Sequence, residues 1–128
     1  MQIDTRQFAD ATVAAPQGRI DHRSAAGFES ALAPLVADAA TRRGALVIDF
    51  AGVDYVSSVG LRVLMVASRQ MRAAEATLAV AAPQSVVAEI FAISRFDKVL
   101  TVCSTLDDAL ALCSSAALAA WQADGGGR

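Results

Sequence analysis

The stretch that most limits the possible folds of this chain is a short apolar run followed by a loop and an amphipathic segment. Leu46-Val47-Ile48 is mostly β-branched and has no polar residue, which is typical of a strand covered on both faces. Gly and Asp within residues 51–54 predict a loop. Beyond Ser57 and Ser58, apolar or small residues recur at helical spacing: Leu61, Leu64, Met65, Ser68 and Met71. The stretch therefore predicts strand, loop and helix, with two serines at the helix start.

These two serines have an ordinary explanation. Serine is a favoured helix N-cap, because its hydroxyl accepts a hydrogen bond from a backbone amide of the first turn and stabilises the helix by about 1 kcal/mol. The first amides of a helix also lack intrahelical partners, which makes the position chemically distinctive. Capping alone accounts for Ser57 or Ser58, so a chemical role needs a further argument.

Three valines of the expected second helix, Val59, Val63 and Val66, fall off its buried stripe at i, i+4 and i+7. They could pack against a neighbouring element. We favour the alternative, an exposed apolar patch beside Ser58 that docks a partner. The cationic residues of this helix, Arg62 among them, also lie off the buried stripe.

Length and composition favour one globular domain. The chain has 128 residues, of which 55% are apolar and 19% charged, enough for a real core. A net charge of −2 gives no basic surface that would attract nucleic acid or an anionic membrane. With only 5% aromatic residues, a base-stacking surface is not expected either. Charges interrupt every apolar stretch before a membrane-spanning length, and the N-terminus lacks a signal-peptide core. Cys103 and Cys113 are interpreted as buried or half-buried free thiols, so we expect a cytoplasmic protein without a cofactor or metal.

The first part of the chain predicts two strands and a helix. Residues 1–15 resemble a pair of short antiparallel strands, and Pro16 interrupts them. Asp21 is the expected N-cap of a helix that continues to about Thr41. Pro34 should kink this helix or end its first half, and Gly44 suits the position after its end. The expected buried face consists of Phe28, Leu32, Leu35 and Ala39.

The remainder alternates strands with helices. After the second helix, from Ser58 to about Ala73, we expect a strand over 76–82 and a short helix over 86–93. A last strand lies within 96–102, and a last helix runs from Leu106 to about Trp121. The inner face of the short helix is expected to be Val86, Ile90 and Ile93. The alternation predicts an α/β fold with a mixed sheet of four to five strands and about four helices. Residues 1–122 would form the single domain and 123–128 a flexible tail.

Several catalytic classes lack their motifs. No Gly-rich phosphate loop follows a strand, so nucleotide binding has no motif support. A serine hydrolase would need His22, the only histidine, as its base, and the sequence around Ser58 is not a nucleophile elbow. A phosphoreceiver domain with Asp49 and Lys98 would need an acidic pair after the first strand, where Asp4 stands alone.

The central stretch resembles the signature of the STAS domain, the fold of bacterial anti-sigma factor antagonists. In that signature, an apolar strand ends in Asp, and a loop with an aromatic and an apolar residue leads to Asp-Ser-Ser/Thr/Ala-Gly-Leu. The corresponding residues here are Asp49, Tyr55, Val56, Ser57, Ser58, Val59, Gly60 and Leu61. Ser57 replaces the usual Asp, and Val59 replaces the usual small residue. Weaker matches continue through the Ala-x-Pro after the fourth strand to the Leu-Asp-Asp-Ala-Leu of the last helix.

The resemblance implies an anti-sigma factor antagonist that works by partner switching and is not an enzyme. Ser58 matches the serine that is phosphorylated in the family, and Asp21 matches an aspartate close to it. The unmodified protein would bind an anti-sigma factor that is also a serine kinase with an ATP-binding domain, thereby freeing a sigma factor. Phosphorylation of Ser58 would abolish this binding, and a serine phosphatase would restore it. The expected partner-binding residues are Asp21, Ser57, Ser58, Val59, Gly60, Arg62, Val63 and Val66.

Two alternatives use the same fold. Some stand-alone STAS domains are constitutive subunits of lipid-transport ABC complexes, and the replacements at Ser57 and Val59 are compatible with such a role. The other alternative is a scaffold domain of a large homo-assembly. Under the ABC-complex alternative, Ser58 would serve mainly as a helix cap.

Overall fold

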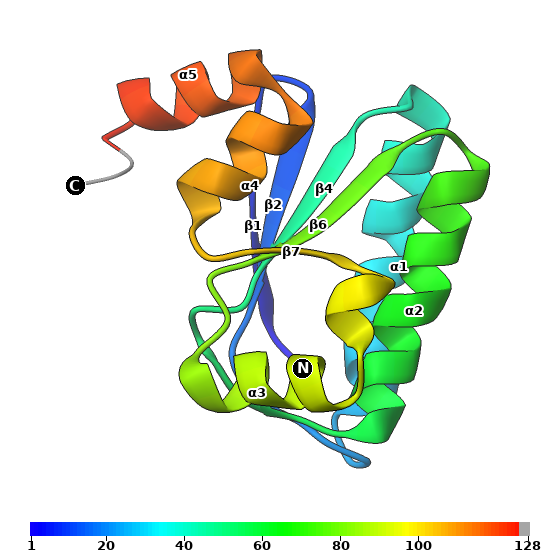
Figure 1. Ribbon diagram of the computed structural model, residues 1–128. Coiled ribbons are helices and arrows are strands. Elements are labelled where there is room, and N and C mark those ends of the chain that lie inside the picture. Colours follow the sequence, from blue (N-terminus) through cyan, green and yellow to red (C-terminus); the bar gives the residue numbers. More distant parts are fainter. Residues whose placement is uncertain (126–128) are drawn as a thin grey trace.

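The computed structural model describes residues 1–125 (Figure 1). Its five-stranded sheet has the order β1-β2-β4-β6-β7. The hairpin of β1 (Ile3–Phe8) and β2 (Ala11–Pro16) is antiparallel. From β2 onward the neighbours are parallel: β4 (Ala45–Asp49), β6 (Thr77–Ala81) and β7 (Thr101–Cys103). The α/β fold with a mixed sheet is thus confirmed.

A second, two-stranded sheet lies beyond the end of the first one and was not predicted. It pairs β3 (Gly18–Ile20) with β5 (Val53–Val56) in parallel. The interpretation of residues 51–54 as a loop is wrong from Val53 onward. Val53 and Val56 are buried at 0% and 1% exposure and, three residues apart, point to opposite faces of β5, so the two ends of this short strand are buried on different faces.

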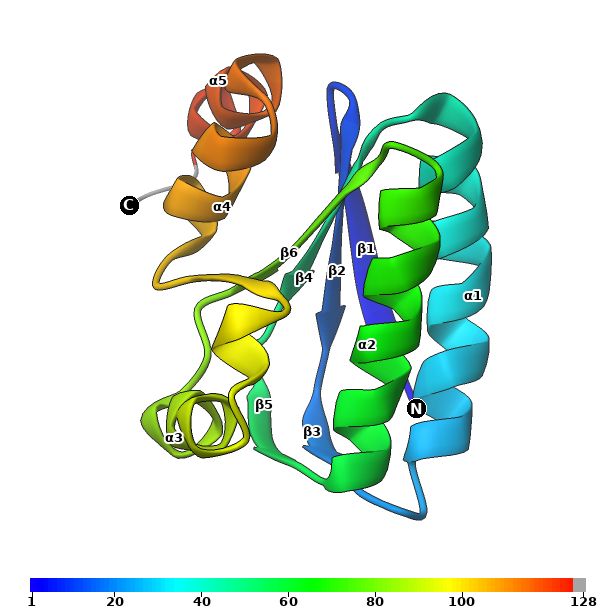
Figure 2. The same ribbon diagram turned by 45° about the vertical axis from the view of Figure 1, so that its right-hand side comes forward.

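Helices cover both faces of the main sheet (Figure 2). On one face, α1 (Ala25–Arg42) packs beside α2 (Ser58–Ala73) over the larger core. On the other face, α4 (Leu106–Cys113) and α5 (Ser115–Ala123) close a smaller core. The helix α3 (Ser85–Ile93) contacts β5 at the lower end of Figure 2, followed by the 3-10 turn η1 (Phe96–Lys98).

The expected last helix is two helices. Ser114 has extended backbone angles (φ −167°, ψ 120°), and its hydroxyl accepts a hydrogen bond from the amide of Ala117, which starts α5. The same hydroxyl donates to Asp10 Oδ1 at 2.5 Å, so the break is attached to the hairpin turn. The described residues therefore form five α-helices, where about four were expected.

The first helix begins later than predicted. Its N-cap position is Ser24, and Asp21 lies in the turn before it, so the assignment of Asp21 as N-cap is wrong. Pro34 lies inside α1, which does not end there. The left-handed residue at the helix end is Arg43 (φ 50°) and not Gly44. The buried face consists of Ala25, Phe28, Leu32, Val36 and Ala39, with the predicted Leu35 only half-buried.

The predicted inner face of α3 is wrong at Val86 and Ile93, whereas Ile90 is half-buried and packs against the core. The buried residues of α3 are Val87 and Phe91, whereas Val86 is 54% and Ile93 78% exposed. Phe91 stacks on Phe50 with 5.8 Å between the ring centroids. The aromatic pair fills the core, and this rotates the smaller apolar residues of α3 toward solvent.

The predicted tail, 123–128, lies partly outside the described residues. Ala123 is the last residue of α5, and the carboxylate of Asp124 pairs with the Arg6 guanidinium of β1. Residues 126–128 lie outside the described part of the chain. Within residues 1–125, no helix is both long and apolar enough to cross a membrane.

Candidate functional site

The start of α2 is attached to the end of β3 through the backbone. The amide of Ser57 donates a hydrogen bond of 2.7 Å to the carbonyl oxygen of Ile20. The Ser57 hydroxyl accepts from the amide of Gly60 at 3.3 Å, so Ser57, and not Ser58, is the N-cap. One of the two predicted serines is thereby assigned to capping, and Ser58 is left as the first residue of the helix.

Gly60 allows α2 to approach β3 and β5 closely. A Cβ atom added at Gly60 would lie 2.7 Å from Ile20 Cγ2 and 2.9 Å from Val56 Cγ2, both shorter than real contacts. Ile20 and Val56 are buried at 0% and 1% exposure. Gly60 therefore acts through packing beneath the site and is itself buried, so it does not offer a surface to a partner.

Ser58 is exposed, and within residues 1–125 its hydroxyl makes no hydrogen bond. The first turn of α2 contains no acidic residue, although a helix N-terminus favours negative charge. Because the first turn of α2 has free backbone amides and no carboxylate of its own, an anion added at Ser58 would be favourable. The arrangement presents one free hydroxyl to solvent in a fixed place.

Asp21 directly follows Ile20, as Ser58 directly follows Ser57, so the Ile20–Ser57 hydrogen bond holds the two positions on adjoining segments. The Asp21 carboxylate accepts hydrogen bonds from the amides of Arg23 (2.9 Å) and Ser24 (3.2 Å). The hydrogen bond from the Arg23 amide is the main cause of an Asp21 pKa below the usual value. Asp21 is therefore a fixed negative charge at neutral pH.

The contact of Arg19 with Tyr55 and Asp21 was not predicted. The guanidinium of Arg19 lies 4.4 Å from the centroid of the Tyr55 ring, and its Nε lies 3.6 Å from Asp21 Oδ2. Arg19 and Tyr55 are paired in the register of β3 and β5. Tyr55 matched the aromatic position of the signature, but its pairing with Arg19 was missed, because residues 51–54 were interpreted as a loop and β5 was not predicted.

The predicted apolar patch is smaller than expected. Val59 and Val66 are 47% and 39% exposed, but Val63 is 8% exposed and packs in the core, so its assignment to the exposed patch is wrong. Val63 faces α1 because α1 and α2 pack side by side. A shallow pocket of about 250 Å³ between these helices is lined by both Val63 and Val66. Arg62 is exposed on the outer side of α2.

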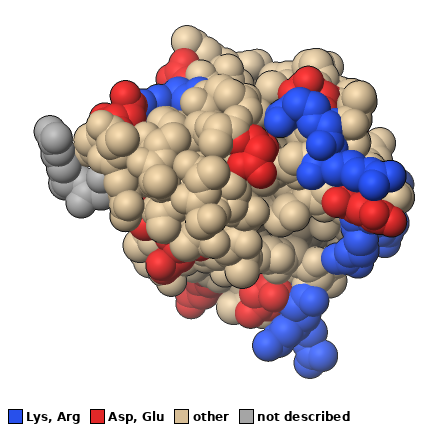
Figure 3. Space-filling view, turned by 90° about the horizontal axis from the view of Figure 1, so that it is seen from above, with Lys and Arg blue, Asp and Glu red and all other residues tan. Residues whose placement is uncertain are grey.

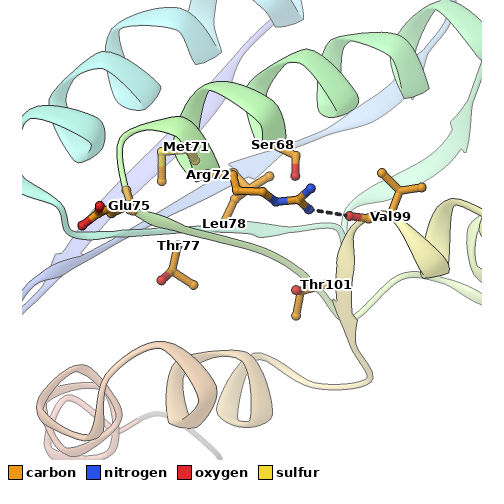
Figure 4. Close-up of a pocket in the computed structure, with 9 residues that line it drawn as sticks. Ser68, Met71, Arg72, Glu75, Thr77, Leu78, Val99 and Thr101 are labelled. Carbon is orange, nitrogen blue, oxygen red and sulfur yellow. Dashed lines mark hydrogen bonds between the residues drawn. The ribbon is translucent and has the colours of Figure 1, made fainter.

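Other features lie away from Ser58. A pocket of about 330 Å³ lies beside the C-terminal half of α2, where Arg72 Nη2 donates to the carbonyl oxygen of Val99 at 3.3 Å (Figure 4). Viewed from above, Lys and Arg side chains gather over the side of the molecule that carries α1 and α2 (Figure 3). Among residues 1–125, no group of three or more His, Cys, Asp or Glu side chains could hold a metal ion.

A mixed sheet with helices on both faces and an exposed serine opening α2 are the features of a STAS domain. The family model described as STAS domain matches residues 2–109, so the chain belongs to this family. This confirms the resemblance drawn from the central stretch.

Within the STAS family, the chain is similar to proteins named as anti-sigma factor antagonists. RsfB of Mycobacterium tuberculosis, an anti-sigma-F factor antagonist, is 38% identical over 93 residues, which cover 73% of each chain. BtrV of Bordetella bronchiseptica, named as an anti-sigma factor antagonist, is 33% identical over 116 residues, covering 91% of this chain and 97% of BtrV. The crystal structure of an anti-sigma factor antagonist from Mycobacterium paratuberculosis has a TM-score of 0.78 at 28% identity, covering 88% of this chain and 92% of that one.

Proposed function

We propose that this protein is an anti-sigma factor antagonist that acts by partner switching, with Ser58 as its phosphoacceptor. The unmodified protein binds an anti-sigma factor with an ATP-binding serine kinase domain and so frees a sigma factor. The observation that carries the proposal is the exposed Ser58 hydroxyl at the start of α2, which has no hydrogen-bond partner within residues 1–125, in a chain similar to proteins named as anti-sigma factor antagonists. The protein is a binding module and a kinase substrate.

The contact surface would combine Ser58 with the exposed Val59, Val66 and Arg62 of α2. Val59 and Val66, which are 47% and 39% exposed, would provide its apolar contacts. Asp21, on the adjoining segment, contributes a fixed negative charge. The buried Gly60 and Val63 and the capping Ser57 support this surface from below.

Phosphorylation would release the partner through local electrostatics. A phosphoserine adds about −1.5 to −2 charge at neutral pH. The amides of the first turn can hold the phosphate, so the fold need not change. In the complex, however, the dianion would lie near Asp21 and against an apolar contact, where it is repelled and costly to desolvate. Release then follows from lost affinity, and a serine phosphatase would reverse it.

The test is a capture experiment from host lysate with the wild-type chain, Ser58→Ala and Ser58→Asp as baits. Ser115→Asp is the matched control, because Ser115 is also an exposed first residue of a helix and also follows a capping serine. We expect wild type, Ser58→Ala and Ser115→Asp to capture a protein with an ATP-binding kinase domain, and Ser58→Asp to lose it. Equal capture by all four would exclude switching through Ser58. If the captured protein were a transporter ATPase, partner switching would be rejected in favour of a role as a constitutive subunit of a lipid-transport complex.

A further inference from the structure

The three arginines of α2 have no carboxylate on their own helix. The sequence of α2, Ser58–Ala73, contains Arg62, Arg69 and Arg72 and no Asp or Glu. Arg72 donates to Val99, whereas Arg62 and Arg69 are exposed and form no ion pair or hydrogen bond among residues 1–125. Some exposed arginines elsewhere have partners, such as Arg42 with Asp38 at 3.0 Å and Arg43 with Glu75 at 4.0 Å, whereas the side chains of Arg23 and Arg95 have none within residues 1–125.

Arg62 stands one helical turn after Ser58. Side chains at i and i+4 lie on the same helix face with their Cβ atoms about 5–6 Å apart, within reach of an arginine. The order matters, because an anion placed four residues before a cation is the more favourable arrangement. Arg69 lies on the same face, but it is about 16 Å along the helix axis from Ser58, at 1.5 Å per residue. Of the two free arginines of α2, Arg62 is therefore the one that can reach a group attached to the Ser58 hydroxyl.

We infer that Arg62 binds the phosphate of phosphorylated Ser58 within the same chain. The guanidinium donates hydrogen bonds to the phosphate oxygens, a geometry that arginine forms well. Before modification the same guanidinium has no ion pair or hydrogen bond within residues 1–125. Phosphorylation therefore occupies both the Ser58 hydroxyl and the Arg62 guanidinium. This inference rests on the proposed function only in assuming that Ser58 is modified.

The chain provides its own control position. Ser115 opens α5 as Ser58 opens α2, and each follows a capping serine whose hydroxyl accepts from the third helical amide. Four residues after Ser115 stands Ala119, which has no charge. A phosphate at Ser115 would therefore lie at the N-terminus of a helix with no arginine four residues later.

The test requires neither the kinase nor the partner. Phosphoserine is incorporated genetically at position 58 or 115 of the full chain, and its second ionisation is followed by phosphorus NMR. We expect the second pKa of phosphoserine 58 to lie about 0.3 pH unit below that of the same chain with Arg62→Gln, because a nearby cation favours the dianion. Arg69→Gln, which removes the same charge further away, should leave it unchanged, and Arg62→Lys should keep part of the difference. High salt should reduce the difference.

Two results would overturn the binding of the phosphate by Arg62. If Arg62→Gln changes the pKa of phosphoserine 58 no more than Arg69→Gln does, Arg62 does not bind the phosphate. An equal effect of Arg62→Gln on phosphoserine 115 would show a general charge effect and would also overturn the inference. Neither result bears on whether a host kinase modifies Ser58, which the capture experiment decides separately.

Discussion

The backbone amide of Ser57 donates a 2.7 Å hydrogen bond to the carbonyl oxygen of Ile20. This bond joins two segments that are far apart in the sequence, and it places Asp21 and Ser58 on neighbouring chain segments. Because the link is made by backbone atoms, a change in the Asp21 or Ser58 side chain does not remove it. Substitutions of Ser58 can therefore be interpreted as changes in its surface chemistry.

Ser57→Ala should destabilise the protein more than Ser58→Ala. The first substitution removes the oxygen that accepts from the Gly60 amide, and loss of such a cap costs about 1 kcal/mol of unfolding free energy. The second removes a hydroxyl without hydrogen bonds, so its effect should remain within about 0.5 kcal/mol. Urea denaturation of both variants measures the difference. Equal losses would mean that Ser57 does not act as the cap.

Gly60→Ala should be destabilising although alanine is the better helix former. The propensity gain of about 1 kcal/mol is opposed by contacts of 2.7 and 2.9 Å with buried side chains, and such overpacking costs about 1–3 kcal/mol. Gly27→Ala in α1 is the comparison variant, because its added Cβ would lie 2.8 Å from the backbone nitrogen of the half-buried Met1 and also requires a shift. We expect both variants to unfold at a lower temperature than the wild-type chain in thermal melts. A stabilised Gly60→Ala protein would contradict the close approach of α2 to β3.

The two faces of α3 should respond differently to truncation. Phe91→Ala removes a ring that is 1% exposed and stacked on Phe50, which costs about 3–5 kcal/mol. Ile93→Ala changes a side chain that is 78% exposed and should shift the unfolding free energy by less than about 0.5 kcal/mol. Chemical denaturation tests both. A larger loss for Ile93→Ala would restore the face predicted from the sequence.

Cys113 should be a slowly reacting thiol in the folded protein. Burial is the main cause that raises its pKa to about 11, and Cys103 and Asp10 add to the shift. At pH 8 the folded chain should then hold about a hundredfold less Cys113 thiolate than the unfolded chain, so iodoacetamide should label it far more slowly. The unfolded thiol ionises first, so the stability contribution is complete below about pH 9 and is lost as the pH rises toward 11. Peptide mass spectrometry measures the labelling, and equal rates in folded and urea-unfolded protein would contradict the burial.

The sequence predicted the central strand and α2 because their patterns are long and regular. The apolar run 46–48 and the stripe from Leu61 to Met71 lie where expected, and the hairpin and the α/β class are confirmed. The predictions were wrong for the short elements β5 and α3. Four residues suffice for β5, and Gly52 and Asp54 around its start indicated a loop. In α3, nine residues gave two plausible apolar faces, and only the stacking of Phe91 on Phe50 selects between them.

At the site, the sequence located both serines and could not assign their roles from pattern alone. The backbone geometry divides these roles, because the Gly60 amide donates to Ser57 and leaves Ser58 free. The exposure of Val63 was predicted wrongly, because helical spacing does not show that α1 packs against that side of α2.

The central claim is that phosphate on Ser58 itself controls partner binding. The most direct measurement is the dissociation constant of the captured anti-sigma factor for the unmodified chain and for chains carrying phosphoserine at position 58 or 115. We predict that phosphoserine 58 weakens binding more than a hundredfold, which is about 3 kcal/mol, whereas phosphoserine 115 leaves it unchanged. If the phosphoserine 58 chain binds as tightly as the unmodified chain, or if both modified chains are weakened equally, the proposed switch is wrong.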